Sequence, residues 1–160
     1  RLNPNFALAY NNRGITYRRK KQFYLAIQDY TEAIRLNPNF ASAYYNRGIA
    51  HKSKGEYQEA IADYTQAIRL NPHYLHAYIN RGIAHEDIKE YDRAIADYTQ
   101  AIAVDAGSAD AYANRGYVYL KTGDYDRAIA DFDQALAIKP THKFARSNRD
   151  QALREKAKRG

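Results

Sequence analysis

The chain of 160 residues has no cysteine, no methionine and no tryptophan, and only four prolines. Without cysteine there is no disulfide framework, no thiolate zinc site and no cysteine nucleophile. No run approaches the ~18 consecutive apolar residues of a membrane-spanning helix, so we expect no membrane insertion. Phosphate-binding glycine loops and the His-Glu-x-x-His and Gly-x-Ser-x-Gly motifs are absent as well. We therefore expect no catalysis, no cofactor and no metal site.

What the chain does have is sixteen tyrosines, 45% hydrophobic residues and a clear internal repeat. An offset of 34 residues aligns the chain with itself, without insertion or deletion. The motif Ala-Tyr-x-Asn-Arg-Gly lies at 9–14, 43–48, 77–82 and 111–116. A second motif, Ala-Ile-x-Asp followed by Tyr or Phe, begins at residues 26, 60, 94 and 128. The sequence therefore consists mainly of four tandem copies of one element.

Each copy carries a helical hydrophobic pattern that is interrupted once. We number the places in a repeat from Ala7, Ala41, Leu75 and Ala109. Small and apolar residues follow a 3.6-residue period that breaks near place fifteen, which predicts two helices per repeat. We expect the glycine at place eight to face the alanine at place twenty and let the two helices approach closely. Stacked helical hairpins would then bury one continuous core.

The repeat has a recognisable signature. Tyr stands at place four, Gly at place eight, Ala at places twenty and twenty-seven, and Pro at place thirty-two in most copies. Over residues 1–142 this pattern closely resembles the tetratricopeptide repeat family. The resemblance implies an all-α superhelix of stacked hairpins. Two departures are the arginine at place seven, where the family usually has leucine, and Ala106, which replaces the third proline.

The period also predicts the organisation of the chain. Residues 1–6 duplicate the end of a repeat, so we expect them to be the remnant of a truncated preceding repeat. Residues 143–160 start in register but become charged, which favours a C-terminal capping helix. Between them we expect repeats at 7–40, 41–74, 75–108 and 109–142.

Arginine at place seven and aspartate at place twenty-three recur in every repeat. The arginine lies on the same helical face as a small packing residue and so needs a partner. The aspartate is the one acidic position present in all four copies. We predict a structural ladder of Arg–Asp pairs, within or between repeats, with ligand binding by the arginines as the alternative. The residues are Arg13, Arg47, Arg81, Arg115, Asp29, Asp63, Asp97 and Asp131.

Asparagine at place six is the second recurrent feature. It lies on the first-helix face opposite the packing face, the face that lines the concave groove of tetratricopeptide arrays. The series resembles the asparagine ladder of the O-linked N-acetylglucosamine transferase repeat domain, which implies a grip on peptide backbone. A carboxamide has one acceptor and two donors, as this role requires. The alternative is a surface residue that hydrogen-bonds locally. The expected groove residues are Asn12, Asn46, Asn80, Asn114, Asn148, Tyr45, Ile49, His76, Ile83 and Tyr117.

These features predict a non-catalytic scaffold that holds an extended peptide or a partner helix in its groove. The partner would be a protein or peptide. A structural or self-assembling element, and a regulatory or substrate-binding segment of a larger enzyme, remain alternatives. The carboxylate clamp of chaperone-binding arrays is disfavoured, because the places that need basic residues hold His76 and Asp110.

Net charge of +7 is concentrated at the two ends of the chain. Because two acidic repeats separate the basic segments, no continuous basic stripe can follow a phosphate backbone, and we expect no nucleic-acid partner. The run Arg18–Lys21 is best explained as a solvated helix end, with contact to an acidic partner as the alternative. Leu2 and Phe6 would normally pack on an upstream repeat, so we expect self-association through residues 1–20.

Overall fold

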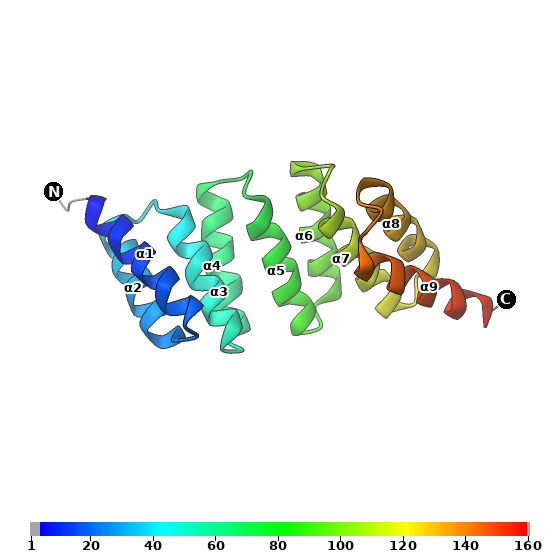
Figure 1. Cartoon of the computed structure of the whole chain (residues 1–160), viewed down its shortest axis with the longest axis horizontal. Helices are drawn as coiled ribbons and strands as arrows, with labels where there is room; N and C mark the ends of the chain where they lie inside the picture. Colours follow the sequence, from blue (N-terminus) through cyan, green and yellow to red (C-terminus); the bar gives the residue numbers. More distant parts are fainter. Residues whose placement is uncertain (1–3, 160) are drawn as a thin grey trace. The chain divides into compact units, whose positions relative to one another are not determined.

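The structure is a computed structural model that describes residues 4–159, and these residues are helical with short connections (Figure 1). No strand occurs among them. The helices are α1 (Pro4–Arg19), α2 (Phe23–Leu36), α3 (Ala41–Ser53), α4 (Tyr57–Leu70), α5 (Leu75–Asp87), α6 (Tyr91–Val104), α7 (Ala109–Thr122), α8 (Tyr125–Ile138) and α9 (Lys143–Ala157). None of them is long and apolar enough to cross a membrane.

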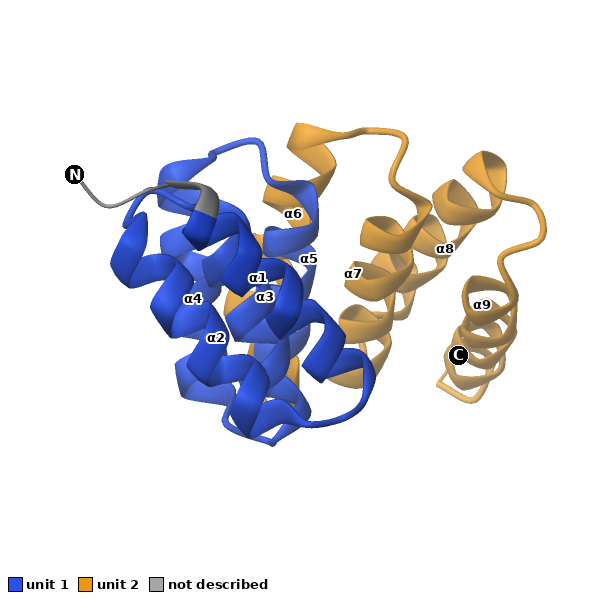
Figure 2. Cartoon of the chain, turned by 60° about the vertical axis from the view of Figure 1, so that its left-hand side comes forward, with its two compact units in different colours: residues 1–84 blue, residues 85–160 orange. Residues whose placement is uncertain are grey.

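The chain divides into two compact units, residues 1–84 and residues 85–160, coloured separately in Figure 2. In unit 1, α1 packs on α2 and α3 on α4, and α3 also contacts α1 and α2. In unit 2, α7 packs between α6 and α8, and α9 covers α8 and touches α7. Helix α5 crosses the boundary between the units. Within each unit the architecture is a stack of antiparallel helical pairs.

The helix ends follow from local backbone chemistry. Helices α2 and α4 end at Asn37 and Asn71, which are extended with φ of −138°, the conformation that the residue before a proline favours; Asp105 ends α6 with a similar φ of −144° before Ala106. Helix α7 ends at Gly123, whose φ of 81° is the left-handed conformation that glycine adopts without strain. The side chain of Asp124 then accepts the backbone N–H of Arg127 and caps α8.

A fully buried aromatic ring at place twenty-four forms the centre of each hairpin. Tyr30, Tyr64, Tyr98 and Phe132 are completely buried. We expected the place-eight glycine to face the alanine at place twenty. In the fourth repeat a Cβ on Gly116 would lie 3.2 Å from the carbonyl oxygen of Ala128, whereas in the first repeat the atoms nearest to Gly14 belong to the ring of Tyr30. A Cβ on Gly14 would lie 2.7 Å from the Tyr30 ring. The glycine therefore makes room for a ring, and the same holds for Gly48 against Tyr64.

Candidate interaction surface

Three of the predicted arginine–aspartate pairs form bidentate ion pairs inside one repeat. Arg13 donates to both carboxylate oxygens of Asp29 at 2.7 Å. Arg47 does the same with Asp63, and Arg115 with Asp131 at 2.8 Å. The aspartates are buried, so the fork of the guanidinium supplies the hydrogen bonds that water would otherwise give. The Asp29 carboxylate raises the pKa of Arg13.

The same arginines also reach back to the preceding repeat, through a threonine that sequence reasoning did not single out. Arg47 Nη1 donates to the Thr31 hydroxyl at 3.1 Å, and Arg115 Nη1 to the Thr99 hydroxyl at 3.0 Å. Each arginine thus joins its own second helix to that of the repeat before it. The arginine side chain is 21% exposed at position 47, whereas Arg13 is 57% exposed.

The fourth predicted pair, Arg81 and Asp97, has its members in different units. Within unit 1, Arg81 Nη1 donates to the Thr65 hydroxyl at 3.0 Å, which repeats the backward contact of the other arginines. Within unit 2, Asp97 is buried and lies 3.8 Å from Nε2 of His85. Both residues therefore have polar neighbours in their own unit.

Two of the predicted groove asparagines bind the preceding repeat. The Asn46 amide donates to Oδ1 of Asn11 at 3.0 Å. The Asn80 amide donates to the Tyr45 hydroxyl at 3.1 Å and to the His76 carbonyl at 2.9 Å. Asn80 therefore uses both amide hydrogens inside unit 1, and only its carbonyl oxygen is left for a peptide N–H.

The other three asparagines differ from one another. Asn148 donates to the Phe144 carbonyl at 2.8 Å, the local hydrogen bond of a helix-surface amide. The side chains of Asn12, which is exposed, and Asn114, which is half-buried, make no hydrogen bond to the described residues. The asparagine at place six thus bonds to the preceding repeat in some copies, bonds within its own helix in another, and makes no hydrogen bond to the described residues in the rest.

The first helices of the repeats form what we call the first-helix surface. In unit 1 this surface contains aromatic rings that pack on one another. The Tyr45 ring lies 4.8 Å from the Tyr74 ring and 5.9 Å from the Tyr64 ring, measured between centroids. Burial raises the pKa of Tyr45. Ile49 and Ile83 are half-buried, and Ile49 packs against the core around Tyr64. The side chain of His76 is exposed.

The corresponding surface of unit 2 combines charge with aromatic rings. Tyr117 meets Phe144 edge to face at 5.3 Å, and Phe144 is 40% exposed. The Lys121 ammonium lies 4.7 Å from the centre of the Tyr117 ring and donates to Glu86 at 3.0 Å. An aromatic pair beside an internally paired cation is a surface that a peptide side chain can pack on.

Histidine replaces tyrosine at place eleven of the second and third repeats, and both histidines serve packing and bonding. His51 Nδ1 lies 2.7 Å from Oε2 of Glu56, and His85 Nδ1 is equally close to Glu90. The hydrogen bonds from Lys54 and His51 lower the pKa of Glu56. The part of the chain that the structure describes contains no cluster of three residues suited to hold a metal.

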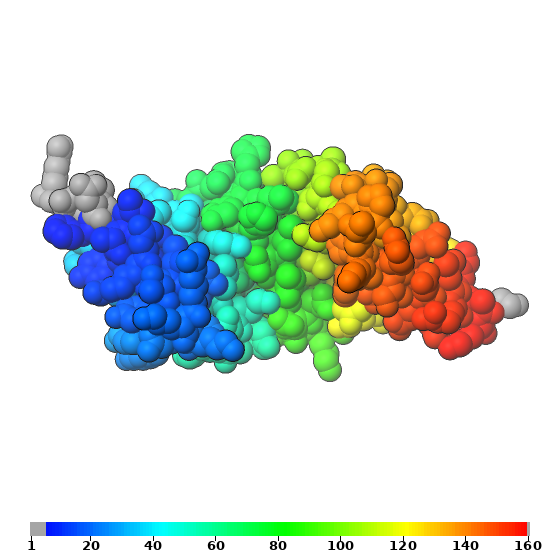
Figure 3. Space-filling view, viewed as in Figure 1, coloured from blue at the N-terminus to red at the C-terminus, as the bar shows by residue number. Residues whose placement is uncertain are grey.

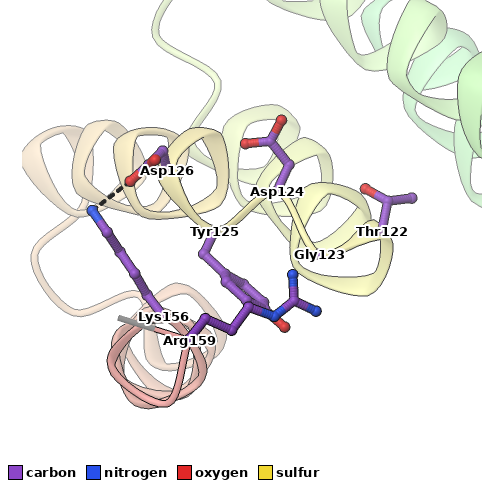
Figure 4. A pocket seen from close by; sticks show the side chains of 7 residues that line it. All are labelled: Thr122, Gly123, Asp124, Tyr125, Asp126, Lys156 and Arg159. Carbon is purple, nitrogen blue, oxygen red and sulfur yellow. Dashed lines mark hydrogen bonds and ion pairs between the residues drawn. The ribbon is translucent and has the colours of Figure 1, made fainter.

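Unit 2 has a polar hollow of about 500 Å³ at the turn between α7 and α8 (Figure 4). Lys156 pairs with Asp126 across it, and the Arg159 guanidinium lies 4.7 Å from the centre of the Tyr125 ring. Lys156 therefore has an acidic partner at the hollow, whereas Arg159 contacts an aromatic ring.

Arg18 is the residue whose environment differs most from the sequence interpretation. The run Arg18–Lys21 was expected to be a solvated helix end, and Arg19, Lys20 and Lys21 are indeed exposed. Arg18, however, is only partly exposed, and its Nε is buried without a hydrogen-bond partner. The signal that could have revealed it is its place: place twelve lies one turn beyond the packing residue at place eight.

The comparisons with known proteins agree with this architecture. A tetratricopeptide repeat family model matches residues 7–40, 41–74 and 109–142, and a TPR repeat model matches residues 87–123. No curated protein matches the sequence.

Solved structures share the fold. The MamA protein has a TM-score of 0.80 and 27% identity over 96% of this chain and 89% of its own. The Arabidopsis OM64 TPR domain has a TM-score of 0.69 and 28% identity over 71% of this chain and 94% of its own. The first TPR of Spaghetti (RPAP3), bound to the HSP90 peptide SRMEEVD, has a TM-score of 0.71 and 24% identity over 73% and 93%, a likeness of fold.

The chain therefore belongs to the tetratricopeptide repeat family, since the family model matches well over half of its residues. Its fold class is the all-α helical-repeat superhelix. Members of this family commonly act as protein–protein interaction modules.

Proposed function

We propose that the chain is a non-catalytic interaction module that holds an extended peptide or a partner helix on its first-helix surface. The observation that carries this proposal is the row of amides fixed from repeat to repeat in unit 1. Asn46 and Asn80 are held by their own N–H groups, and their carbonyl oxygens accept no bond from the described residues. Two fixed acceptors, one in each of two successive repeats, are suited to the N–H groups of an extended chain.

The asparagine ladder is thus proposed in a modified form. An unmodified ladder would use donors and acceptors of every asparagine, but Asn80 has no amide hydrogen to spare. Tyr45 contributes in two ways, because its ring offers contact area and its hydroxyl orients the Asn80 amide. Side chains that change between repeats, such as His76 and Tyr117, would supply specificity.

Capture of a partner with the intact chain tests this proposal. We expect Asn46→Ala with Asn80→Ala to weaken capture, each amide contributing ~1 kcal/mol of net hydrogen bonding. Thr65→Ala on the second helix of the same unit is the control and should capture normally. If the two asparagine changes leave capture unaffected but Tyr45→Ala abolishes it, binding depends on the Tyr45 ring. Capture that survives all three changes would refute the proposal that the partner binds this surface.

Self-association through α1 is a second candidate, and one hollow favours it. A cavity of about 240 Å³ is lined by Phe6, Ala9, Tyr10 and Arg13, and Phe6 is 60% exposed. Leu2, which the sequence analysis also assigned to this contact, lies outside the described residues. Sedimentation over a wide concentration range decides the matter: Phe6→Asp should remain monomeric if the wild type associates. A wild-type monomer at high concentration would exclude this candidate.

A further inference from the structure

The turn between α1 and α2 differs in charge from the corresponding turns of the other repeats. We call residues 18–25, from the end of α1 to the first residues of α2, the basic turn. It holds four basic residues and no acidic residue. The corresponding residues 52–59 and 120–127 each hold two basic and two acidic residues, and residues 86–93 hold two basic and four acidic ones. Only the first of the four repeats therefore has a turn with an excess of positive charge.

The positive charge of the basic turn is not neutralised by neighbouring side chains. Residues 19–21, all of them lysine or arginine, are exposed, and none of them forms an ion pair with the described residues. In the second repeat, Lys54 stands at the place of Lys20 and pairs with Glu56. The first repeat has Gln22 at the place of Glu56, and an amide carries no charge to pair with an ammonium. The basic turn therefore attracts anions from outside the described residues.

Two apolar side chains lie in the same turn. Places eighteen and nineteen of the repeat are exposed in all four copies. In the first copy they hold Tyr24 and Leu25, which are 67% and 38% exposed. The other copies have polar side chains there, namely Gln58, Glu59, Asp92, Arg93, Asp126 and Arg127. Because three copies fold with polar residues at these places, the hydrophobic core does not require the tyrosine or the leucine.

The basic turn has a defined backbone and lies at one end of unit 1. The N–H of Lys21 donates to the Arg18 carbonyl at 2.9 Å, and that of Gln22 to the Tyr17 carbonyl at 2.9 Å. The turn between α3 and α4 lies at the same end of the unit (Figures 1 and 2). In Figure 3 the blue atoms of α1 and α2 are uncovered at the lower edge of unit 1. Cations and apolar side chains are thus presented together at the end of a helical pair.

We propose that the basic turn docks unit 1 onto the surface of a membrane that contains anionic lipids. The basic side chains pair with the negative headgroups, and the apolar area of Tyr24 and Leu25 enters the boundary between headgroups and acyl chains. A tyrosine suits this boundary, since its ring is apolar and its hydroxyl stays in water. The basic turn lies at the ends of the helices and not along the first-helix surface. The inference therefore goes beyond the proposed function and does not depend on it.

A membrane fits these features better than a protein or a nucleic acid does. A stable protein contact takes about 20–30 residues from each partner, which is more than one turn supplies. A nucleic acid is bound by cations spaced along its backbone, and Leu25 has no ring on which a base stacks. A bilayer is flat, so the end of a helical pair meets it without a matching hollow. Binding through such a small patch is weak and reversible.

Co-sedimentation of the intact chain with lipid vesicles tests the proposal. One set of vesicles is phosphatidylcholine alone, and the other mixes phosphatidylcholine with phosphatidylserine at about three to one, which makes the surface negative. We expect the chain to sediment with the mixed vesicles at low salt and to stay in solution with phosphatidylcholine alone. Higher salt should weaken the binding, because it screens exposed charges.

Two double variants separate the charged from the apolar contribution. Arg19→Gln with Lys20→Gln should weaken binding roughly twentyfold, since each basic residue near an anionic surface contributes roughly fivefold. Tyr24→Gln with Leu25→Gln should weaken it about tenfold, because this change removes the apolar area that enters the bilayer. All four side chains are exposed, so circular dichroism should show that both variants fold as the wild type does.

Arg35→Gln with Arg69→Gln is the matched control. Both arginines are exposed, in the last turns of α2 and α4, and their removal lowers the charge of unit 1 by the same amount as the first variant. They lie at the ends of these helices that are distant from the turns within each repeat. We expect the control to bind mixed vesicles within about twofold of the wild type at moderate salt.

Several results would overturn the proposal. No binding to the mixed vesicles, or equal binding to both sets, would refute docking on anionic lipids. Equal losses in the control and in the Arg19 and Lys20 variant would show that diffuse charge attracts the vesicles. Unchanged binding of the Tyr24 and Leu25 variant would refute entry into the bilayer. Tighter binding of oligothymidine or polyglutamate, dependent on the basic turn, would assign it to nucleic acid or to an acidic protein. None of these results affects the proposed function, which capture with the Asn46 and Asn80 variants decides.

Discussion

Replacing Arg47 with methionine is the most direct test of the contacts that join the repeats. The change removes two hydrogen bonds to the buried carboxylate of Asp63 and one to the hydroxyl of Thr31. Breaking a buried pair from one side costs ~3–5 kcal/mol because the remaining charge is stranded. Arg47 is 21% exposed, so we take the lower end, and the lost bond to Thr31 adds ~1 kcal/mol.

Arg13→Met provides the comparison. Arg13 makes the same two bonds to Asp29, but it is 57% exposed and has no bond to a threonine within the described residues. Water can therefore reach Asp29 more easily when the arginine is removed, and we expect a clearly smaller loss of stability than for Arg47→Met. The two variants remove the same chemical group from equivalent places, so their difference isolates burial and the link between repeats.

Urea unfolding followed by circular dichroism measures both losses. With a total stability of ~5–15 kcal/mol, a loss of ~4 kcal/mol should lower the midpoint clearly. The double change Arg47→Met with Asp63→Asn should recover part of the loss, since it leaves no buried charge behind. An unchanged midpoint for Arg47→Met, or an equal loss for Arg13→Met, would refute this account of the ladder.

Two further predictions concern buried and capping groups. Tyr64→Phe should leave stability unchanged or raise it by ~1 kcal/mol, because it removes a buried hydroxyl without a partner. Tyr98→Phe should lower stability by a similar amount, because that hydroxyl is bonded to Glu86; equal midpoints in urea would contradict this pair of predictions. The hydrogen bonds from Arg127, first from its side chain and then from its backbone, lower the pKa of Asp124 below its ordinary 3.8. Because the folded pKa is the lower one, the stabilisation is present above pH 3.8 and is lost as pH falls through the folded value. Asp124→Asn should keep the helix cap and remove this acid sensitivity, which stability curves measured between neutral and acidic pH can check.

The repeat fold could be predicted because four copies report the same hydrophobic period, so chance departures in one copy are outweighed by the others. The contact between Arg13 and Asp29 could be anticipated for a similar reason, since both positions recur and each needs the other.

Other contacts could not be read from the repeat. The burial of Nε of Arg18 depends on the packing of the assembled helices, which the repeat pattern does not contain. The ring of Tyr30 lies nearest to Gly14, a contact that the pairing of small residues in the repeat did not indicate. The unequal bonding of Asn80 and Asn114 likewise depends on neighbours that vary between copies.

The arginine contacts have a consequence for how such a chain can lengthen or shorten. Arg47 bonds to residues sixteen positions before and sixteen positions after itself, and Arg115 repeats both separations. Every bond of this kind therefore ends within the same repeat or the one before it. Gene duplication or deletion of a whole 34-residue segment would recreate the same bonds across the new junction. Gain or loss of a single residue between these partners would shift one of them around its helix by ~100° and break the contact.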